Sequence, residues 1–132
     1  MEFTTDQKRL VRKRRNAIWS KGEKLVHNVL KGSGLRFYQE FYFNELKVAG
    51  SSKLLFFDFY LPDCEVAIEF DGEQHYTRQF HGKPIKNGER NDFLKTAFCF
   101  KKGIKLLRIK YTDIDRTEEI ILNFFDKHFP TT

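Results

Sequence analysis

Apolar residues recur with two different periods along this chain, and together these periods predict three helices and four strands. Helical spacing, with apolar residues three and four positions apart, begins near Ser20, again over 89–102 and again after Asp115. Shorter runs rich in aromatic and branched residues predict strands at 36–43, 54–61, 65–71 and 104–111. Residues 72–88 hold three glycines and a proline without periodicity, which indicates a loop.

The order of these elements predicts the fold class. A helix, three strands, a helix, a strand and a last helix are typical of an α/β domain with a mixed four-stranded sheet flanked by helices. The strand over 54–61 is apolar on both faces, so we expect it near the middle of the sheet. A chain of 132 residues suits one core, and we expect a single domain over 20–132 after a basic helix or arm over 1–19.

Positive charge is concentrated at the N-terminus. The net charge is +6, and residues 1–36 alone hold ten Lys or Arg against three acids. Such a block favours nucleic acid, because neutralising phosphates releases condensed counterions. A solvated basic helix or a localisation-like arm is the alternative. Six of these side chains fall within one stretch and are the candidate DNA contacts: Lys8, Arg9, Arg12, Lys13, Arg14 and Arg15.

Several classes of protein are disfavoured by the composition. No apolar run approaches the roughly 20 residues that cross a bilayer, and the N-terminus lacks the apolar core of a secretory signal. The two cysteines, Cys64 and Cys99, make neither a disulfide framework nor a four-ligand zinc site. We therefore expect a cytoplasmic protein without a membrane partner or an organic cofactor.

Acidic residues gather where the basic ones are missing. Residues 54–77 contain six Asp or Glu and no Lys or Arg. A basic segment together with an acidic patch suggests divalent cations held between protein carboxylates and phosphate. This combination is the first indication of a nuclease.

Alternation along the strands brings some of these acids together. Glu69 and Asp71 share one side of their strand, and antiparallel pairing places Asp58 of the preceding strand beside Glu69. Asp58 and Glu69 are therefore candidate ligands for Mg²⁺, with the backbone carbonyl of Phe70 as a third. The three acids also have structural alternatives. Asp58 could cap a turn, Glu69 could pair with a buried basic residue such as Arg108, and Asp71 could open a turn with a following glycine.

Four further residues are candidates for the chemistry. His75 follows the strand and titrates near neutral pH, which suits a general acid or base. Gln74 could orient a water or a phosphate. Glu23 would face the site if its helix packs over the sheet, and Asp92 would stand at the head of the 89–102 helix. Taken singly, these residues have ordinary explanations as loop or helix-end residues.

Glu23, the string "FFDFYLPD" around Asp58 and the string "AIEFDGEQH" together resemble the PD-(D/E)xK nuclease superfamily. Within it the chain is most similar to the very-short-patch-repair (Vsr) type and to EDxHD homing endonucleases. The resemblance implies a restriction-endonuclease-like αβββαβ core and metal-dependent hydrolysis of double-stranded DNA, with Mg²⁺ and Mn²⁺ as a substitute, in a bacterial or phage-infected cell. It implies that Asp58 and Glu69 bind metal, that His75 moves protons, and that Glu23 and Asp92 complete the motif.

The chain departs from this pattern at two points. Asp71 stands where the superfamily usually has Lys, and the zinc site and aromatic wedges of Vsr enzymes are not reproduced. A homing-type or stand-alone nuclease therefore fits better than mismatch repair, either as a catalytic domain of a longer protein or with its specificity in the basic segment. Two alternatives remain: an inactive nucleic-acid-binding module of the same fold, and a nuclease for RNA or branched DNA.

Overall fold

A computed structural model describes residues 20–71, 79–80, 83–84 and 86–130. Four strands form one mixed sheet in the order β1-β2-β3-β6, with β6 parallel to β3 and the other neighbours antiparallel. This arrangement confirms the predicted α/β fold with a mixed four-stranded sheet and flanking helices. The elements are α2 (Lys21–Ser33), β1 (Tyr38–Lys47), β2 (Leu54–Leu61), β3 (Val66–Asp71), β4 (Gln79–Phe80), β5 (Lys83–Pro84), α4 (Lys86–Lys102), β6 (Lys105–Lys110), the 3₁₀ helix η1 (Tyr111–Arg116) and α5 (Thr117–His128).

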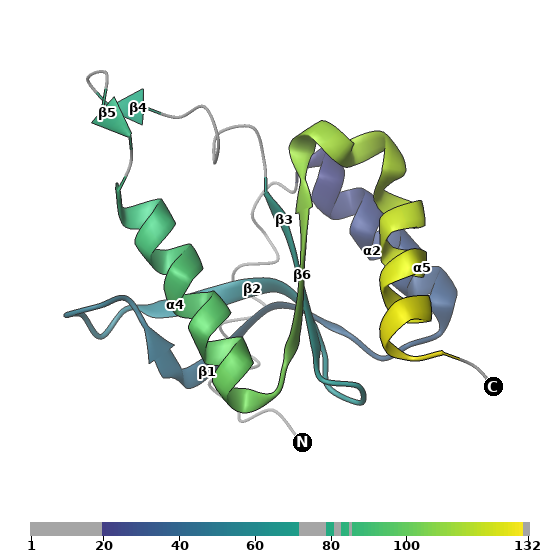
Figure 1. Ribbon diagram of the computed structural model, residues 1–132, viewed down its shortest axis with the longest axis horizontal. Coiled ribbons are helices and arrows are strands. Elements are labelled where there is room, and N and C mark those ends of the chain that lie inside the picture. The colour runs from purple at the N-terminus through teal and green to yellow at the C-terminus, as the bar shows by residue number, and fades with distance from the viewer. Residues whose placement is uncertain (1–19, 72–78, 81–82, 85, 131–132) are drawn as a thin grey trace.

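Three layers result, because helices cover both faces of the sheet (Figure 1). Val26 of α2 and Ile121 of α5 pack against Ile68 of β3 and its neighbours on one face. Cys99 of α4 packs against Phe57 of β2 and its neighbours on the other face. The two central strands are therefore buried on both sides, and all six residues of β3 are buried.

Some boundaries differ from the prediction. β4 and β5 form a short antiparallel ribbon inside 72–88, which was expected to be a loop, and α4 begins at Lys86 instead of residue 89. Asp92 consequently lies in the second turn of α4, so its expected place at the head of the helix is wrong. A cluster of polar residues hid the first turn of α4, because that turn contributes little to the apolar periodicity.

Candidate functional site

The acidic site lies where β2 and β3 separate. The ladder between them pairs Phe59 with Ile68 and continues toward Val66, while both strands extend past Phe59 and Ile68 in the other direction. Beyond this last pair, Asp58 Oδ2 accepts a 2.8 Å hydrogen bond from the backbone N–H of Phe70. The carboxylate of Asp58 therefore takes the place of a ladder carbonyl and is held between the two strands.

The alternation of β2 is interrupted at Asp58. Phe57 packs on the α4 side and Phe59 on the side of α2 and α5, although residues two apart normally share one face. The neighbouring strand is irregular at the same level, because Glu40 of β1 has a φ of 52°. The pairs that flank Glu40 in the register, Gln39–Phe59 and Phe41–Phe57, place Glu40 opposite Asp58. A positive φ is uncommon for a residue with a side chain and is found preferentially at functional sites.

Helix α2 brings a third acid to this place. Its N-cap, Ser20, accepts a 3.1 Å hydrogen bond from the backbone N–H of Glu23 and donates one of 3.3 Å to the Glu23 carboxylate. This N-cap hydrogen bond fixes where the helix begins. Gly22 lies against Phe70 so closely that a Cβ at this position would be 2.1 Å from the aromatic ring. The first turn of α2 can therefore approach the end of β3, as expected if Glu23 is to face the site.

Three carboxylates meet at this point. One oxygen from each of Glu23, Glu40 and Asp58 lies within 4.8 Å of the other two. Burial raises the pKa of Asp58 well above its usual range, and the charges of Glu69, Glu23 and Glu40 raise it further. The hydrogen bond from Phe70 only partly opposes this shift. Three carboxylates that each offer one oxygen, one of them costly to ionise, are a suitable set for a hard divalent cation such as Mg²⁺.

Glu69, the expected second metal ligand, is in contact with a lysine. Lys95 Nζ from α4 lies 2.6 Å from Glu69 Oε1, and both side chains are largely buried. Burial raises the pKa of Glu69, and Lys95 and Arg108 oppose that shift. Arg108, the partner considered from the sequence, donates hydrogen bonds to Thr96 Oγ1 at 2.7 Å and to the carbonyl of Asp92 at 2.8 Å.

The other expected site residues occupy different positions around the cluster. Asp71 ends β3, is buried, pairs with Lys110 of β6 in the ladder and raises the pKa of Glu69 through its charge. Asp92 holds Arg108 through its backbone carbonyl. Phe70 contributes its N–H to Asp58. Outside the described residues lie His75, Gln74 and the six candidate DNA contacts Lys8, Arg9, Arg12, Lys13, Arg14 and Arg15.

Sequence reasoning did not single out Glu40 or Lys95. Glu40 carries one detectable signal, since it is an acid inside the aromatic stretch "RFYQEFYF". Its relation to Asp58 depends on the register of β1 and β2, which the sequence does not fix. Lys95 resembles any other lysine of a helix until the packing of α4 on the sheet is known.

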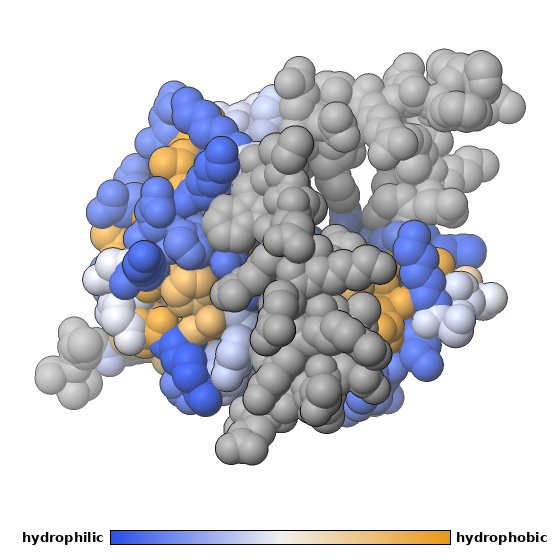
Figure 2. Space-filling model, turned by 180° about the vertical axis from the view of Figure 1, so that it is seen from behind, coloured by the Kyte–Doolittle hydropathy of each residue, from blue (hydrophilic) through white to orange (hydrophobic). Residues whose placement is uncertain are grey.

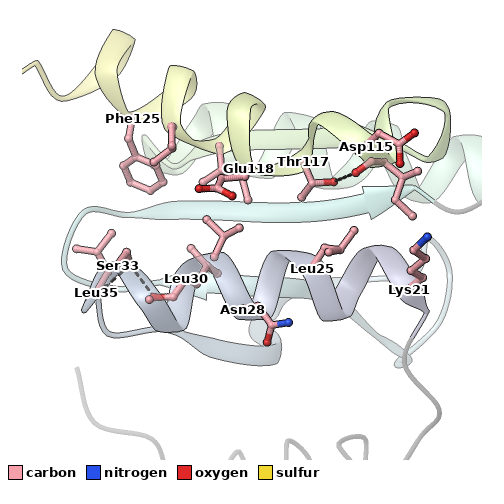
Figure 3. A pocket seen from close by; sticks show the side chains of 15 residues that line it. Lys21, Leu25, Asn28, Leu30, Ser33, Leu35, Asp115, Thr117, Glu118 and Phe125 are labelled. Carbon is pink, nitrogen blue, oxygen red and sulfur yellow. Dashed lines mark hydrogen bonds between the residues drawn. The ribbon is translucent and has the colours of Figure 1, made fainter.

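An apolar groove of about 860 Å³ lies elsewhere, between α2 and α5. Leu25 and Leu30 line it from α2 and Phe125 from α5, with Lys21 and Asp115 at one end (Figure 3). Seen from behind, apolar patches show between hydrophilic ones on this side of the molecule (Figure 2). None of the three clustered acids lines the groove, and an apolar lining does not suit a phosphate. We therefore place the candidate site at the acids and not in this cavity.

Comparison with known proteins bears on the fold. The chain is similar to the catalytic domain of the homing endonuclease I-Bth0305I, with a TM-score of 0.54 and 21% identity, over 84% of this chain and 99% of that one. The two share a fold. A stretch of 67 residues is 34% identical to the uncharacterized protein 094L of Frog virus 3, covering 47% of this chain and 43% of that relative. The chain thus matches less than half the length of that viral protein.

No protein-family model matches the chain. Among the residues that the structure describes, no helix is long and apolar enough to span a membrane.

Proposed function

We propose that this protein is a metal-dependent endonuclease that hydrolyses phosphodiester bonds in double-stranded DNA, of the Vsr-like homing type within the PD-(D/E)xK superfamily. One observation carries the proposal: Glu23, Glu40 and Asp58 converge where β2 and β3 separate. The fold shared with a homing endonuclease catalytic domain supports it. So does the basic segment, which supplies positive charge for binding the DNA backbone.

The cofactor that fits these residues is Mg²⁺, with Mn²⁺ as a substitute. Carboxylate oxygens are the donors that Mg²⁺ prefers, and Glu23, Glu40 and Asp58 would hold it, with the carbonyl of Phe70 as a further candidate. When bound, such an ion lowers the pKa of water and neutralises negative charge on the scissile phosphate. Burial raises the pKa of Asp58, the charges of Glu69, Glu23 and Glu40 raise it further, and this surplus of negative charge favours a cation there.

The remaining roles belong to residues of this chain. His75 would take or give the proton during hydrolysis, and Gln74 would orient the attacking water or the phosphate. Asp71 and Asp92 would complete the polar surroundings of the site. Lys8, Arg9 and the other basic residues of 8–15 would bind phosphates and hold the duplex over the acids.

A plasmid-nicking assay tests the proposal. The wild-type protein should cut supercoiled DNA with Mg²⁺ or Mn²⁺ and not with EDTA. Asp58→Ala and His75→Ala should each lower the rate by roughly 100-fold or more, in line with loss of a metal ligand or a general acid–base. Asp63→Ala is the matched control, because Asp63 is an exposed acid just beyond the end of β2 that pairs with Arg36. Metal-dependent cutting that persists in Asp58→Ala would refute the assignment.

One observation favours a second function, an inactive nucleic-acid-binding module of the same fold. The acid at position 69 is neutralised by Lys95, and position 71 carries Asp where the superfamily usually has Lys. A binding module should retain DNA and bind neither Mg²⁺ nor Mn²⁺ in a calorimetric titration. A nuclease that prefers RNA or branched DNA is separated from both by competition with these substrates in the nicking assay.

A further inference from the structure

An ammonium group already occupies the β3 side of the acidic region. Lys95 Nζ lies 2.6 Å from Glu69 Oε1, and the side chains of Lys95 and Glu69 are only 13% and 6% exposed. The same nitrogen lies 5.5 Å from the centre of the Phe57 ring. A carboxylate on one side and an aromatic face on another both attract a cation, so the ammonium is fixed in place.

A second cation stands close to the same acid. Arg108 of β6 pairs with Glu69 in the β3–β6 ladder, and its charge favours the ionised form of Glu69. Its guanidinium is held by Thr96 Oγ1 and by the carbonyl of Asp92, both on the helix that supplies Lys95. Helix α4 therefore positions two positive groups around Glu69, and these offset its negative charge.

The Asp58 side of the region has the opposite character. Asp58 lies among the carboxylates of Glu23 and Glu40, and burial, together with the charges of Glu69, Glu23 and Glu40, opposes its ionisation. A divalent ion at Asp58 would relieve this repulsion. An ion at Glu69 would have to displace Lys95 or lie against it, and like charges repel strongly where water is scarce.

We propose that Lys95 is a built-in cation for Glu69, so that the protein binds one divalent ion, at Asp58, and Glu69 is not a ligand. This inference rests on the proposed function, because it assigns the metal stoichiometry of that site. Lys95 is then a positioning residue: it holds Glu69 away from the metal and limits the site to one ion. Without its charge, Glu69 becomes an open anionic position beside Asp58 and takes a second ion.

Calorimetric titration of Mn²⁺ into the metal-free full chain tests the inference without any measurement of cutting. Wild type should bind one ion. Glu69→Gln, which keeps the shape of the side chain, should also bind one ion, with a Kd within about threefold of wild type, whereas loss of a true ligand costs on the order of 10–100-fold or more. Lys95→Met keeps the apolar stem over Phe57 and should bind two ions. Lys101→Met removes an exposed lysine of the same helix and should match wild type.

The outcomes separate this inference from the proposed function. Two ions in wild type, or a loss of affinity beyond about tenfold in Glu69→Gln, overturns the role of Lys95 and leaves the nuclease proposal in place. If Asp58→Asn binds Mn²⁺ as tightly as wild type, Asp58 is not a metal ligand, and the metal site on which the nuclease proposal depends is refuted. Circular dichroism checks that Lys95→Met folds, and if it does not, the Glu69→Gln titration still decides.

Discussion

The backbone N–H of Phe70 donates to Asp58 Oδ2 at 2.8 Å, and the ring of the same residue packs against Gly22 of α2. Phe70 therefore fixes the position of the Asp58 carboxylate on β2 and the distance at which α2, the helix that carries Glu23, packs on β3. The polar contact belongs to the backbone and the apolar contact to the side chain, so the two can be perturbed separately. The geometry of the three acids depends on this residue although its own side chain is apolar.

Replacing Asp58 by Asn should stabilise the metal-free protein, and more so at higher pH. The pKa of Asp58 is raised in the folded state, so the folded protein binds this proton more tightly than the unfolded chain does. The free energy of unfolding should then fall as the pH rises from 3.8, the usual value of the carboxyl, through the raised folded-state pKa. Asp58→Asn removes this contribution, so its denaturation curves in EDTA should change less with pH.

Urea denaturation of wild type and Asp58→Asn from about pH 4 to about pH 8 measures this difference. Asp63→Asn is the control, because Asp63 is exposed and its removal should leave the wild-type pH dependence intact. Adding Mn²⁺ should raise the stability of wild type and not of Asp58→Asn, since a ligand stabilises only the state that binds it. An equal pH dependence in wild type and Asp58→Asn would contradict the electrostatic description of the cluster.

Two glycines of α2 give a matched test of the contact with Phe70. Gly22→Ala places a methyl group 2.1 Å from the buried Phe70 ring, and overpacking of this kind should cost about 1–3 kcal/mol of stability. Gly32→Ala on the same helix meets nothing within 4 Å and should gain up to about 1 kcal/mol from helix propensity. Thermal denaturation measures both. If Gly22→Ala is as stable as Gly32→Ala, α2 is not packed closely on β3.

The fold could be predicted from the sequence because its signals are local. The apolar runs of β2 and β3 mark central strands, and Ser20 with Glu23 marks the beginning of α2. Asp58 stands out for the same reason, as a charge inside an apolar run. These features depend on the residues of one element and its immediate neighbours.

The remainder of the site depends on contacts between elements. Glu40 joins the cluster through strand register and a backbone φ of 52°, and neither is visible in residue order. Lys95 reaches Glu69 only because α4 packs its side chain inward, and a helical lysine ordinarily faces water. The sequence suggested Arg108 as the partner of Glu69. The side chain in direct contact with Glu69 is that of Lys95, which lies 26 positions after Glu69 in the sequence.

Glycine variants of Glu40 and Glu65 distinguish the effect of backbone strain on stability from the effect of a lost carboxylate on metal binding. Both have a positive φ, 52° and 54°, but Glu40 is buried among acids and Glu65 is exposed at the turn before β3. Glycine accepts this conformation, and the relief of strain is offset by its larger unfolded-state entropy, so both Gly variants should stay within about 1 kcal/mol of wild type. Only Glu40→Gly should weaken Mn²⁺ binding, by roughly 10-fold or more. Equal affinity in the two variants would remove Glu40 from the site.

Lys95 and Glu69 should be strongly coupled in stability. Removing one partner of a buried ion pair is costly, and Arg108 compensates only part of the charge left on Glu69, so Lys95→Met alone should lose about 3 kcal/mol. The double variant Lys95→Met/Glu69→Gln should recover a large part of this loss, because neither charge remains. Urea denaturation of the four proteins gives the coupling energy. Additive losses would show that the two side chains do not interact in solution.

The basic stretch 8–15 should determine how DNA affinity depends on salt. Each phosphate contact adds a slope of about −0.9 to a plot of log Kobs against log salt concentration. Replacing all six Lys and Arg of this stretch by Gln should therefore make the slope shallower by several units, and affinity at low salt should fall steeply. The control carries Gln at the exposed Lys53, Lys101 and Lys102, which lie outside this stretch. Binding to a duplex in EDTA, followed by fluorescence anisotropy, measures the slope without cutting. An unchanged slope in the six-residue variant would assign the DNA contacts to another face of the protein.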